Sequence, residues 1–224
     1  MDAINFKFWH DDEARTRYEL NGQKGSLAML EANRLVNLDE KETRKVFGNI
    51  PMFKERLQLL RENGFILLKQ YGGKVINILE VGQYEIPKIL DLLYELDPWC
   101  DAYQGHIFMK RAQLFLATIH GHFQKQSPLK GEDQFTLYAD YQIPRALEHL
   151  GILKYSNKLE QKINNAELIE LGSEEELALR SFTIYAGELL AEKVGCPAAY
   201  LDYSLWKSGR QAVKKYHYTR TIWY

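Results

Sequence analysis

The sequence predicts a mainly α-helical protein with at most a few short strands. Apolar residues return at helical spacing through most of the 224 residues, whereas the apolar–polar alternation typical of strands is scarce. Only six prolines interrupt the chain. Since a hydrophobic content of 46% is enough for a sizeable core, we expect one compact domain over residues 1–224.

Helices in the first part of the chain are marked by caps and glycines. One is expected over residues 26–36, because the serine at its start can cap it. A second is expected over 51–64, because its proline suits a first helical turn and Gly64 can end the helix. After the glycines at 72–73, residues 86–96 place their apolar side chains on one helical face. All of these read as ordinary packing helices.

The segment 106–123 predicts a central helix, because it is apolar on two sides. Lys110 lies within this segment. A lysine in such a helix either extends its amine to solvent or requires an anionic partner, such as Asp140 or a ligand phosphate. Both interpretations stay open on the pattern alone.

Two more helices are expected further along. In the stretch 135–153, Pro144 suits a first turn and Gly151 can follow the last one. The segment 173–195 opens with a serine cap and an acidic first turn, and it ends at a glycine.

Asp140 is the first candidate for chemistry. Aspartate is a preferred helix cap, because its side chain accepts hydrogen bonds from backbone N–H groups. The same carboxylate stands among Tyr138, Ala139, Tyr141 and Ile143, and partial burial there can tune its basicity for catalysis. A helix start and a catalytic group are compatible roles.

The final segment is both basic and aromatic. His217 and Arg220 follow Lys214 and Lys215, and such a cluster can hold a phosphate. A solvated basic tail gives the same pattern. Neighbouring rings favour a nucleotide pocket, since aromatic residues beside cations can pack on bases; they are Tyr216, Tyr218, Trp223 and Tyr224.

Composition excludes several classes of protein. A formal net charge of −1 and a pI near 6.6 argue against a broad nucleic-acid surface, so we expect no stable nucleic-acid partner. The two cysteines, Cys100 and Cys196, cannot form a disulfide framework or a cysteine-rich zinc site and fit a reducing, cytoplasmic compartment. No run is apolar for long enough to cross a membrane, and the N-terminus lacks a secretory pattern.

Other common sites are not indicated either. The motifs of phosphate loops, dinucleotide folds, zinc proteases and α/β-hydrolases do not occur in the sequence. His120 and His122 are two residues apart and would diverge on a helix. We therefore expect no metal.

Ordered segments along the chain resemble the queuosine salvage proteins, a family of queuosine 5'-phosphate N-glycosylases. They are NFKFW at 5–9, SLAMLEANRL at 26–35, PMFKERLQLLRENGFILLKQYGG at 51–73, FMKRAQ at 108–113, YADYQIPRALEHLGILKYS at 138–156, LDYSLW at 201–206 and HYTRTIWY at 217–224. Their order and spacing over almost the whole chain make the resemblance specific.

The resemblance implies a helical fold similar to that of DNA glycosylases. It also implies hydrolysis of a small-molecule substrate, queuosine 5'-monophosphate, with release of the base queuine for reuse in tRNA. No metal or organic cofactor is implied. Because queuine is a 7-deazaguanine, the leaving base has no N7 to protonate, and catalysis should depend on stabilising a cationic ribosyl transition state.

Two catalytic residues carry over from the family's motifs. Its catalytic aspartate lies in Phe-Ala-Asp-Tyr-Arg, which here reads YADYQ and places Asp140 in that role. Its lysine in Lys-Arg-Ala-Gln corresponds to Lys110. Asp140 would stabilise the oxocarbenium-like sugar and either orient water or bond briefly to C1'. Lys110 would keep Asp140 ionised or contact the phosphate.

Further residues receive substrate-binding roles through the resemblance. His217 and Arg220 would bind the 5'-phosphate. Asp202 would accept hydrogen bonds from the guanine-like edge or the amine of queuine, unless it caps a helix ahead of Tyr203. Rings that can stack on the base or complete the pocket, or else pack in the core, are Phe8, Trp9, Tyr138, Trp206 and Tyr224.

Two departures from the family pattern leave the substrate open. Gln142 and Tyr218 stand where the family usually has arginines, so two cationic contacts are missing or supplied elsewhere. A different modified nucleotide, an unphosphorylated nucleoside, or a 7-deazaguanine held without cleavage are the alternatives.

Overall fold

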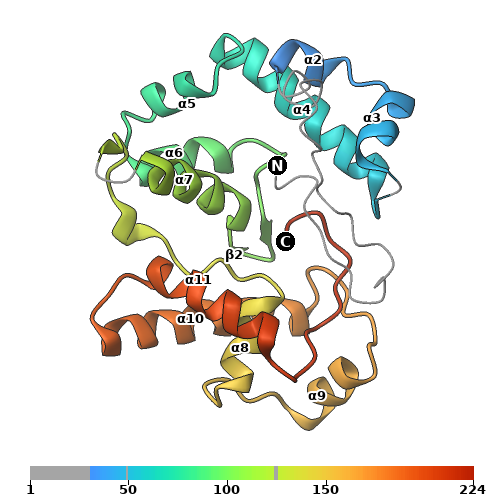
Figure 1. The fold of residues 1–224 in the computed structure, drawn as a ribbon, viewed down its shortest axis with the longest axis vertical. Coiled ribbons are helices and arrows are strands. Elements are labelled where there is room, and N and C mark those ends of the chain that lie inside the picture. The colour runs from blue at the N-terminus through green and yellow to red at the C-terminus, as the bar shows by residue number, and fades with distance from the viewer. Residues whose placement is uncertain (1–30, 49, 124–125) are drawn as a thin grey trace. The chain divides into compact units, whose positions relative to one another are not determined.

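A computed structural model describes residues 31–48, 50–123 and 126–224 of the protein. In this part of the chain there are ten α-helices and one sheet of two strands (Figure 1), which confirms the mainly α-helical prediction. The chain divides into two compact units, residues 1–83 and 84–224. One domain over 1–224, and the likeness to DNA glycosylases, stay predictions.

The first unit contains four helices in its described residues, namely α2 (Ala32–Val36), α3 (Glu40–Phe47), α4 (Phe53–Tyr71) and α5 (Val75–Val81). The expectation that Gly64 ends a helix is wrong, because α4 continues through it. A Cβ at Gly64 would lie 2.6 Å from the Cβ of Leu35, so this glycine instead lets α2 and α4 approach closely. Helix α4 ends at Gly72, whose φ of 56° is left-handed.

The second unit holds the remaining elements. They are α6 (Ile86–Tyr94), β1 (Ala102–Tyr103), β2 (His106–Ile107), α7 (Lys110–Phe123), the 3-10 helix η2 (Glu132–Gln134), α8 (Gln142–His149), α9 (Asn157–Asn164), α10 (Glu174–Val194) and α11 (Ala198–Gln211). The expected helix over 173–195 is confirmed as α10, with the Ser173 side chain accepting a bond from Glu176 N and Gly195 in the left-handed region.

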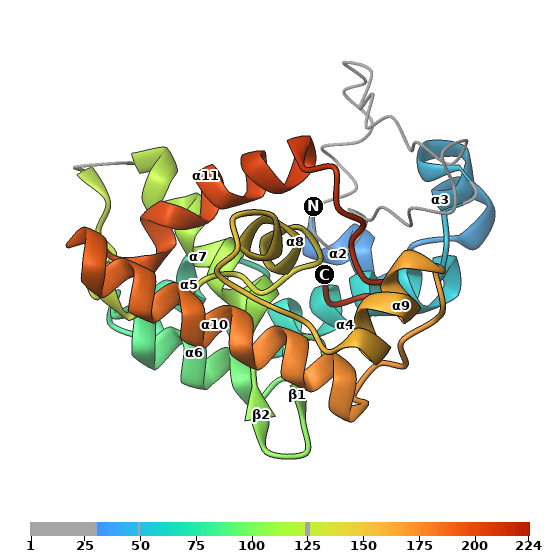
Figure 2. The same cartoon turned by 90° about the horizontal axis from the view of Figure 1, so that it is seen from below.

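Helix α8 lies between α10 and α11, as Figure 2 shows in a view along α8. The contacts are close: a Cβ at Gly209 of α11 would lie 2.4 Å from the carbonyl oxygen of Gln142. The apolar core of this bundle consists of Leu137, Ile143, Ala146, Leu147, Ala186, Ala191, Ala198 and Leu205. Its burial holds α8, and therefore the residues just before α8, in one place.

The extended segment before α8 is pressed against α10. Leu137 has no exposed surface, and a Cβ at Gly187 would lie 2.3 Å from the Leu137 side chain. Arg180 of α10 donates from Nε to the carbonyl oxygen of Ala139 at 3.2 Å. Packing and a buried hydrogen bond thus fix the backbone on the N-terminal side of Asp140.

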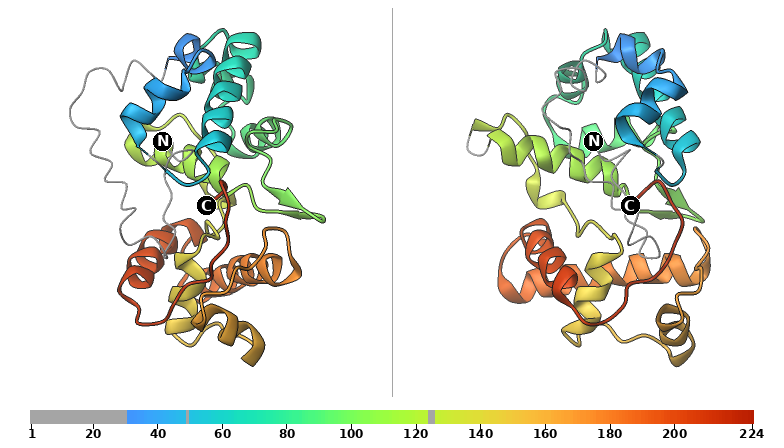
Figure 3. Two further views of the ribbon diagram at one scale, coloured as in Figure 1. Left: turned by 90° about the vertical axis from the view of Figure 1, so that its right-hand side faces the viewer. Right: turned by 45° about the vertical axis from the view of Figure 1, so that its right-hand side comes forward.

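The strands β1 and β2 pair antiparallel through a tight hairpin, which projects from its unit (Figure 3). Both turn residues, Gln104 and Gly105, have positive φ angles of 50° and 83°, as a two-residue turn of this kind requires. In the described residues, no helix is long and apolar enough to cross a membrane.

Candidate active site

Asp140 starts helix α8 with its side chain. Its Oδ1 accepts hydrogen bonds from the backbone N–H of Gln142 at 2.7 Å and of Ile143 at 3.0 Å. The side chain is buried, with 9% of its residue surface exposed. The predicted helix start is therefore confirmed. Because both bonds favour the ionised carboxylate, the same contacts hold a negative charge at a defined point.

Asp202 is a second buried carboxylate near the first. It lies inside helix α11 and its Oδ2 accepts a hydrogen bond from the backbone N–H of Tyr138 at 2.9 Å. The alternative that Asp202 caps a helix ahead of Tyr203 is wrong, because α11 begins at Ala198. Instead, Asp202 joins α11 to the segment that carries Asp140.

The charges of Asp140, Asp202 and Lys110 act on one another. Burial in the first place, and then the negative charge of Asp140, raise the pKa of Asp202 from 3.8 to about 7, although the Tyr138 N–H and the positive charge of Lys110 oppose the rise. Lys110 is the first residue of α7 rather than an interior one. The structure thus brings together the three charged side chains that the sequence selected from distant positions.

A separate cluster of buried charge surrounds Arg180. Its guanidinium donates to both carboxylate oxygens of Asp101, at 2.9 and 2.5 Å, and lies 3.6 Å from Glu176 Oε1. None of these three side chains is exposed. Burial alone would lower the pKa of Arg180, but the hydrogen bonds and charge of Asp101 outweigh it, and the pKa is raised. The cation is therefore permanent.

The Arg180 cluster touches both segments that supply the candidate site. Its guanidinium bonds to the carbonyl preceding Asp140, as noted above, and lies 3.8 Å from the ring centroid of Phe108, two residues before Lys110. It also lies 4.6 Å from the ring centroid of Tyr224. One buried cation therefore links α10, the start of α7, the residue before Asp140 and the C-terminal tyrosine.

His217 and Tyr224 belong to this cluster. The Tyr224 hydroxyl donates to Glu176 Oε1 at 2.9 Å and lies 3.3 Å from His217 Nε2. Burial, followed by the positive charge of Arg180, lowers the pKa of His217 to about 3. Its imidazole is consequently neutral near pH 7, so the phosphate contact predicted for His217 would be a hydrogen bond without a charge.

The basic residues of the tail have different surroundings. Lys214 forms ion pairs with Glu148 at 2.9 Å and with Glu160 at 3.2 Å. Lys215 donates to the carbonyl of Asn164. The four tail residues therefore do not form the single positive cluster that the sequence suggested. Arg220, by contrast, is exposed, and its predicted contact with phosphate stays a prediction.

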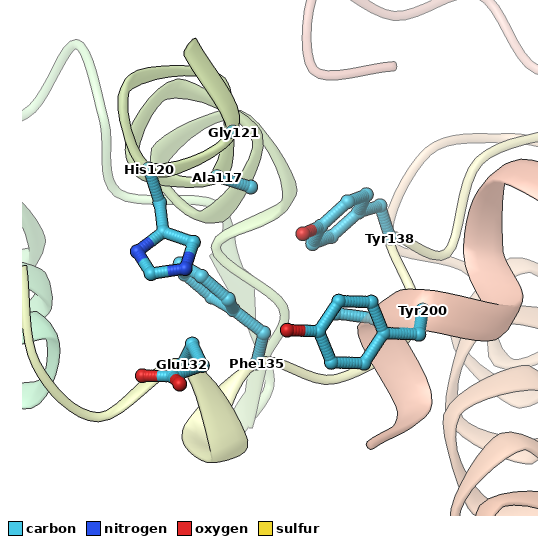
Figure 4. Close-up of a pocket in the computed structure, with 8 residues that line it drawn as sticks. Ala117, His120, Gly121, Glu132, Phe135, Tyr138 and Tyr200 are labelled. Carbon is cyan, nitrogen blue, oxygen red and sulfur yellow. The ribbon is translucent and has the colours of Figure 1, made fainter. Parts of the chain in front are cut away.

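The aromatic residues predicted to stack on the base have different surroundings. Tyr138 is 8% exposed and lines a pocket (Figure 4). Trp206 packs against the α8–α11 core and stacks on Tyr203 with ring centroids 6.4 Å apart. Phe8 and Trp9 lie outside the described residues.

Sequence reasoning missed Asp101, Glu176 and Arg180. Glu176 and Arg180 are one helical turn apart, which is a signal for an ion pair, but the same spacing is typical of a solvated helix face. Asp101 is 79 residues away from Arg180, and no local pattern indicates it. Groups of three or more potential metal ligands are absent from the described residues.

The fold and the site define a helical protein built around a fixed buried carboxylate with a lysine and a second carboxylate nearby, an arrangement suited to stabilising positive charge on a substrate. The chain belongs to the queuosine salvage protein family, whose sequence model matches residues 1–224.

Curated relatives match along the whole chain. A Dictyostelium discoideum protein named queuosine 5'-phosphate N-glycosylase/hydrolase is 30% identical, and the match covers 100% of this chain and 76% of that protein. Proteins of the same name from Sphaerobacter thermophilus and Bos taurus are 29% and 28% identical, and each match covers 100% of this chain and 79% of the relative.

Proposed function

We propose that this protein hydrolyses the N-glycosidic bond of queuosine 5'-monophosphate and releases queuine. Membership of the queuosine salvage family and the names of its relatives support this activity. The observation that carries the proposal is the buried Asp140 carboxylate, held by two backbone N–H groups beside Asp202 and Lys110.

Asp140 would stabilise the transition state through its charge. As the bond between C1' and the base breaks, its electron pair leaves with the base and positive charge develops on the ribose. A carboxylate already fixed in position stabilises that charge without reorganising. Water then supplies the new C1' oxygen, and one of its protons ends on the base. Direct attack by water and a short-lived bond from Asp140 to C1' both satisfy this balance.

Asp202 and Lys110 would support Asp140 in different ways. Lys110 would place a positive charge near the carboxylates, which favours their ionised forms. Asp202 would accept hydrogen bonds from the base or its amine, and its pKa near 7 makes that acceptor dependent on pH. Arg220, which is exposed, would contact the 5'-phosphate.

A direct test follows the free base. Purified protein is incubated separately with queuosine, queuosine 5'-monophosphate and guanosine 5'-monophosphate, and released base is measured by mass spectrometry. We expect queuine from the queuosine nucleotide at the highest rate. Equal release from all three would contradict the proposed substrate. Binding of the nucleotide with no base released would instead identify a binding protein.

A further inference from the structure

A pocket beside Tyr138 lies close to the candidate active site. It has a volume of about 180 Å³ and lies between the C-terminal end of α7, η2 and the start of α11 (Figure 4). Ligand pockets for whole drug-sized molecules have volumes of roughly 300–1,000 Å³, so this one suits only part of a nucleotide. At about 30 Å³ for each water in the liquid, the pocket has the volume of about six waters, which is enough for a small ring with polar groups.

Tyr138 directs an unpartnered hydroxyl into this pocket. The residue is more than nine-tenths buried, and the hydroxyl points into the space in Figure 4. The hydroxyl makes no hydrogen bond to the residues that the structure describes, and it is not among their enclosed unpaired atoms, so it is open to a molecule in the pocket. Burial, and then the charge of Asp202, raise the pKa of Tyr138, so the hydroxyl keeps its proton and can donate it in a hydrogen bond.

The pocket and the two carboxylates share structural elements. The Tyr138 backbone N–H bonds to Asp202, while Ala199 and Tyr200, which also line the pocket, lie within one turn of Asp202 on α11. If Asp202 holds the base, a substituent on that base can therefore reach into the pocket.

The walls of the pocket select for the chemistry of that substituent. Aromatic surface comes from Phe135, His120 and Tyr200, and the Tyr200 hydroxyl also points inward. Glu132 adds a carboxylate at the wall. No lysine or arginine lines the described pocket. A phosphate is therefore disfavoured, whereas a hydroxylated ring or an amine is favoured.

We propose that this pocket binds the hydroxylated ring that queuine carries through an amine on its 7-deazaguanine base, with Tyr138 donating a hydrogen bond to a ring hydroxyl. This proposal rests on the proposed function, and it assigns to the pocket the selection of queuine over bases that lack the ring.

The test compares two nucleotides, queuosine 5'-monophosphate and 7-deazaguanosine 5'-monophosphate, which lacks the substituent. In Tyr138→Phe we expect the ratio of kcat/KM for the first nucleotide to that for the second to fall about fivefold, the loss of one neutral hydrogen bond. Ala199→Leu, which fills the pocket with a good helix former, should lower the ratio by at least about tenfold. Tyr203→Phe, on an exposed residue of the same helix outside the pocket, is the matched control and should leave the ratio unchanged.

An unchanged ratio in both Tyr138→Phe and Ala199→Leu would overturn the proposal. If the wild-type protein releases no base from either nucleotide, the proposed function fails, and calorimetric binding of queuine and 7-deazaguanine then tests the pocket alone. Weaker queuine binding in Ala199→Leu, with 7-deazaguanine binding retained, would support the pocket. Equal losses for the two bases would reject it.

Discussion

The Arg180 cluster and the Asp140–Asp202 pair are both buried in the same unit, yet they differ in how their charge is compensated. Arg180 donates two hydrogen bonds to Asp101. The nearby Glu176 carboxylate accepts hydrogen bonds from the Gly172 N–H and the Tyr224 hydroxyl. At Asp202, burial first and then the negative charge of Asp140 raise the pKa to about 7, and the Tyr138 N–H and the charge of Lys110 offset this rise only in part. Removing one member of a compensated buried cluster destabilises a fold, whereas a buried carboxylate with a raised pKa beside a second carboxylate is typical of a reactive site.

The comparison predicts the largest effect on turnover at Asp140. Asn in its place retains an oxygen that can accept the bonds from Gln142 and Ile143, so the helix start should survive. Because the fixed negative charge is lost, kcat should fall by at least about 10³-fold. Steady-state release of queuine measures the loss, and a thermal midpoint near the wild-type value shows that the fold is retained. Full activity would mean that Asp140 only caps α8.

Arg180 should affect stability most. In Arg180→Met, two buried carboxylates lose their cation, and the unfolding free energy should fall by about 3–5 kcal/mol. Chemical denaturation measures this, with Lys193→Met as the control because Lys193 is exposed on the same helix; its change should stay within about 0.5 kcal/mol.

A double variant sharpens the same prediction. If Asp101 and Arg180 compensate each other's charge, the double variant Arg180→Met with Asp101→Leu should lose less unfolding free energy than the sum of the losses in the two single variants. Losses that simply add would show that the two side chains act independently.

Asp202 should control the pH dependence. As the base acceptor it must be ionised, so kcat/KM should rise as the pH increases through about 7. In Asp202→Asn, kcat/KM should fall about tenfold at pH 8 and less at pH 6. The change of kcat/KM with pH near pH 7 should therefore become smaller. A rate that falls above pH 7 in the wild type alone would indicate that Asp202 donates a proton instead.

The same carboxylate links pH to stability. Folding raises the pKa of Asp202 from 3.8 to about 7, so between these values the folded state binds more protons than the unfolded state. The contribution of Asp202 to stability is then lost as the pH rises through this window. Asp202→Asn should therefore raise the thermal midpoint more at pH 8 than at pH 5, and the reverse order would contradict the raised pKa.

Arg220 should give the smallest of these effects. Because it is exposed, its contact with the 5'-phosphate is screened by solvent. In Arg220→Ala, KM for queuosine 5'-monophosphate should rise about fivefold, while the nucleoside is unaffected. Equal changes for nucleotide and nucleoside would place Arg220 away from the phosphate.

Sequence patterns predicted the features that depend on local physics. The Ser173 cap, the end of α10 at Gly195 and the role of Asp140 at the start of α8 follow from backbone hydrogen-bonding rules. Gly64 does not end a helix as its sequence context predicts, because close helix packing and helix ending both favour glycine, and only the neighbouring helix distinguishes them.

Long-range electrostatics could not be predicted in the same way. On α10, Glu176, Arg180 and Thr183 follow one face and read as a solvated stripe, yet all three are fully buried. Their burial depends on Asp101, Phe108 and the C-terminal residues, which are distant in sequence. The sequence likewise suggests that Lys214 is available to bind phosphate, although its ion pairs with Glu148 and Glu160 offset its charge.

The most direct measurement is a crystal structure of the Asp140→Asn protein with intact queuosine 5'-monophosphate bound. We expect the side chain at position 140 to face C1' at about 3–3.5 Å, Asp202 to lie at the edge of the base and the ring substituent of queuine to lie beside Tyr138. A different carboxylate at C1', with position 140 turned away from the ribose, would contradict it.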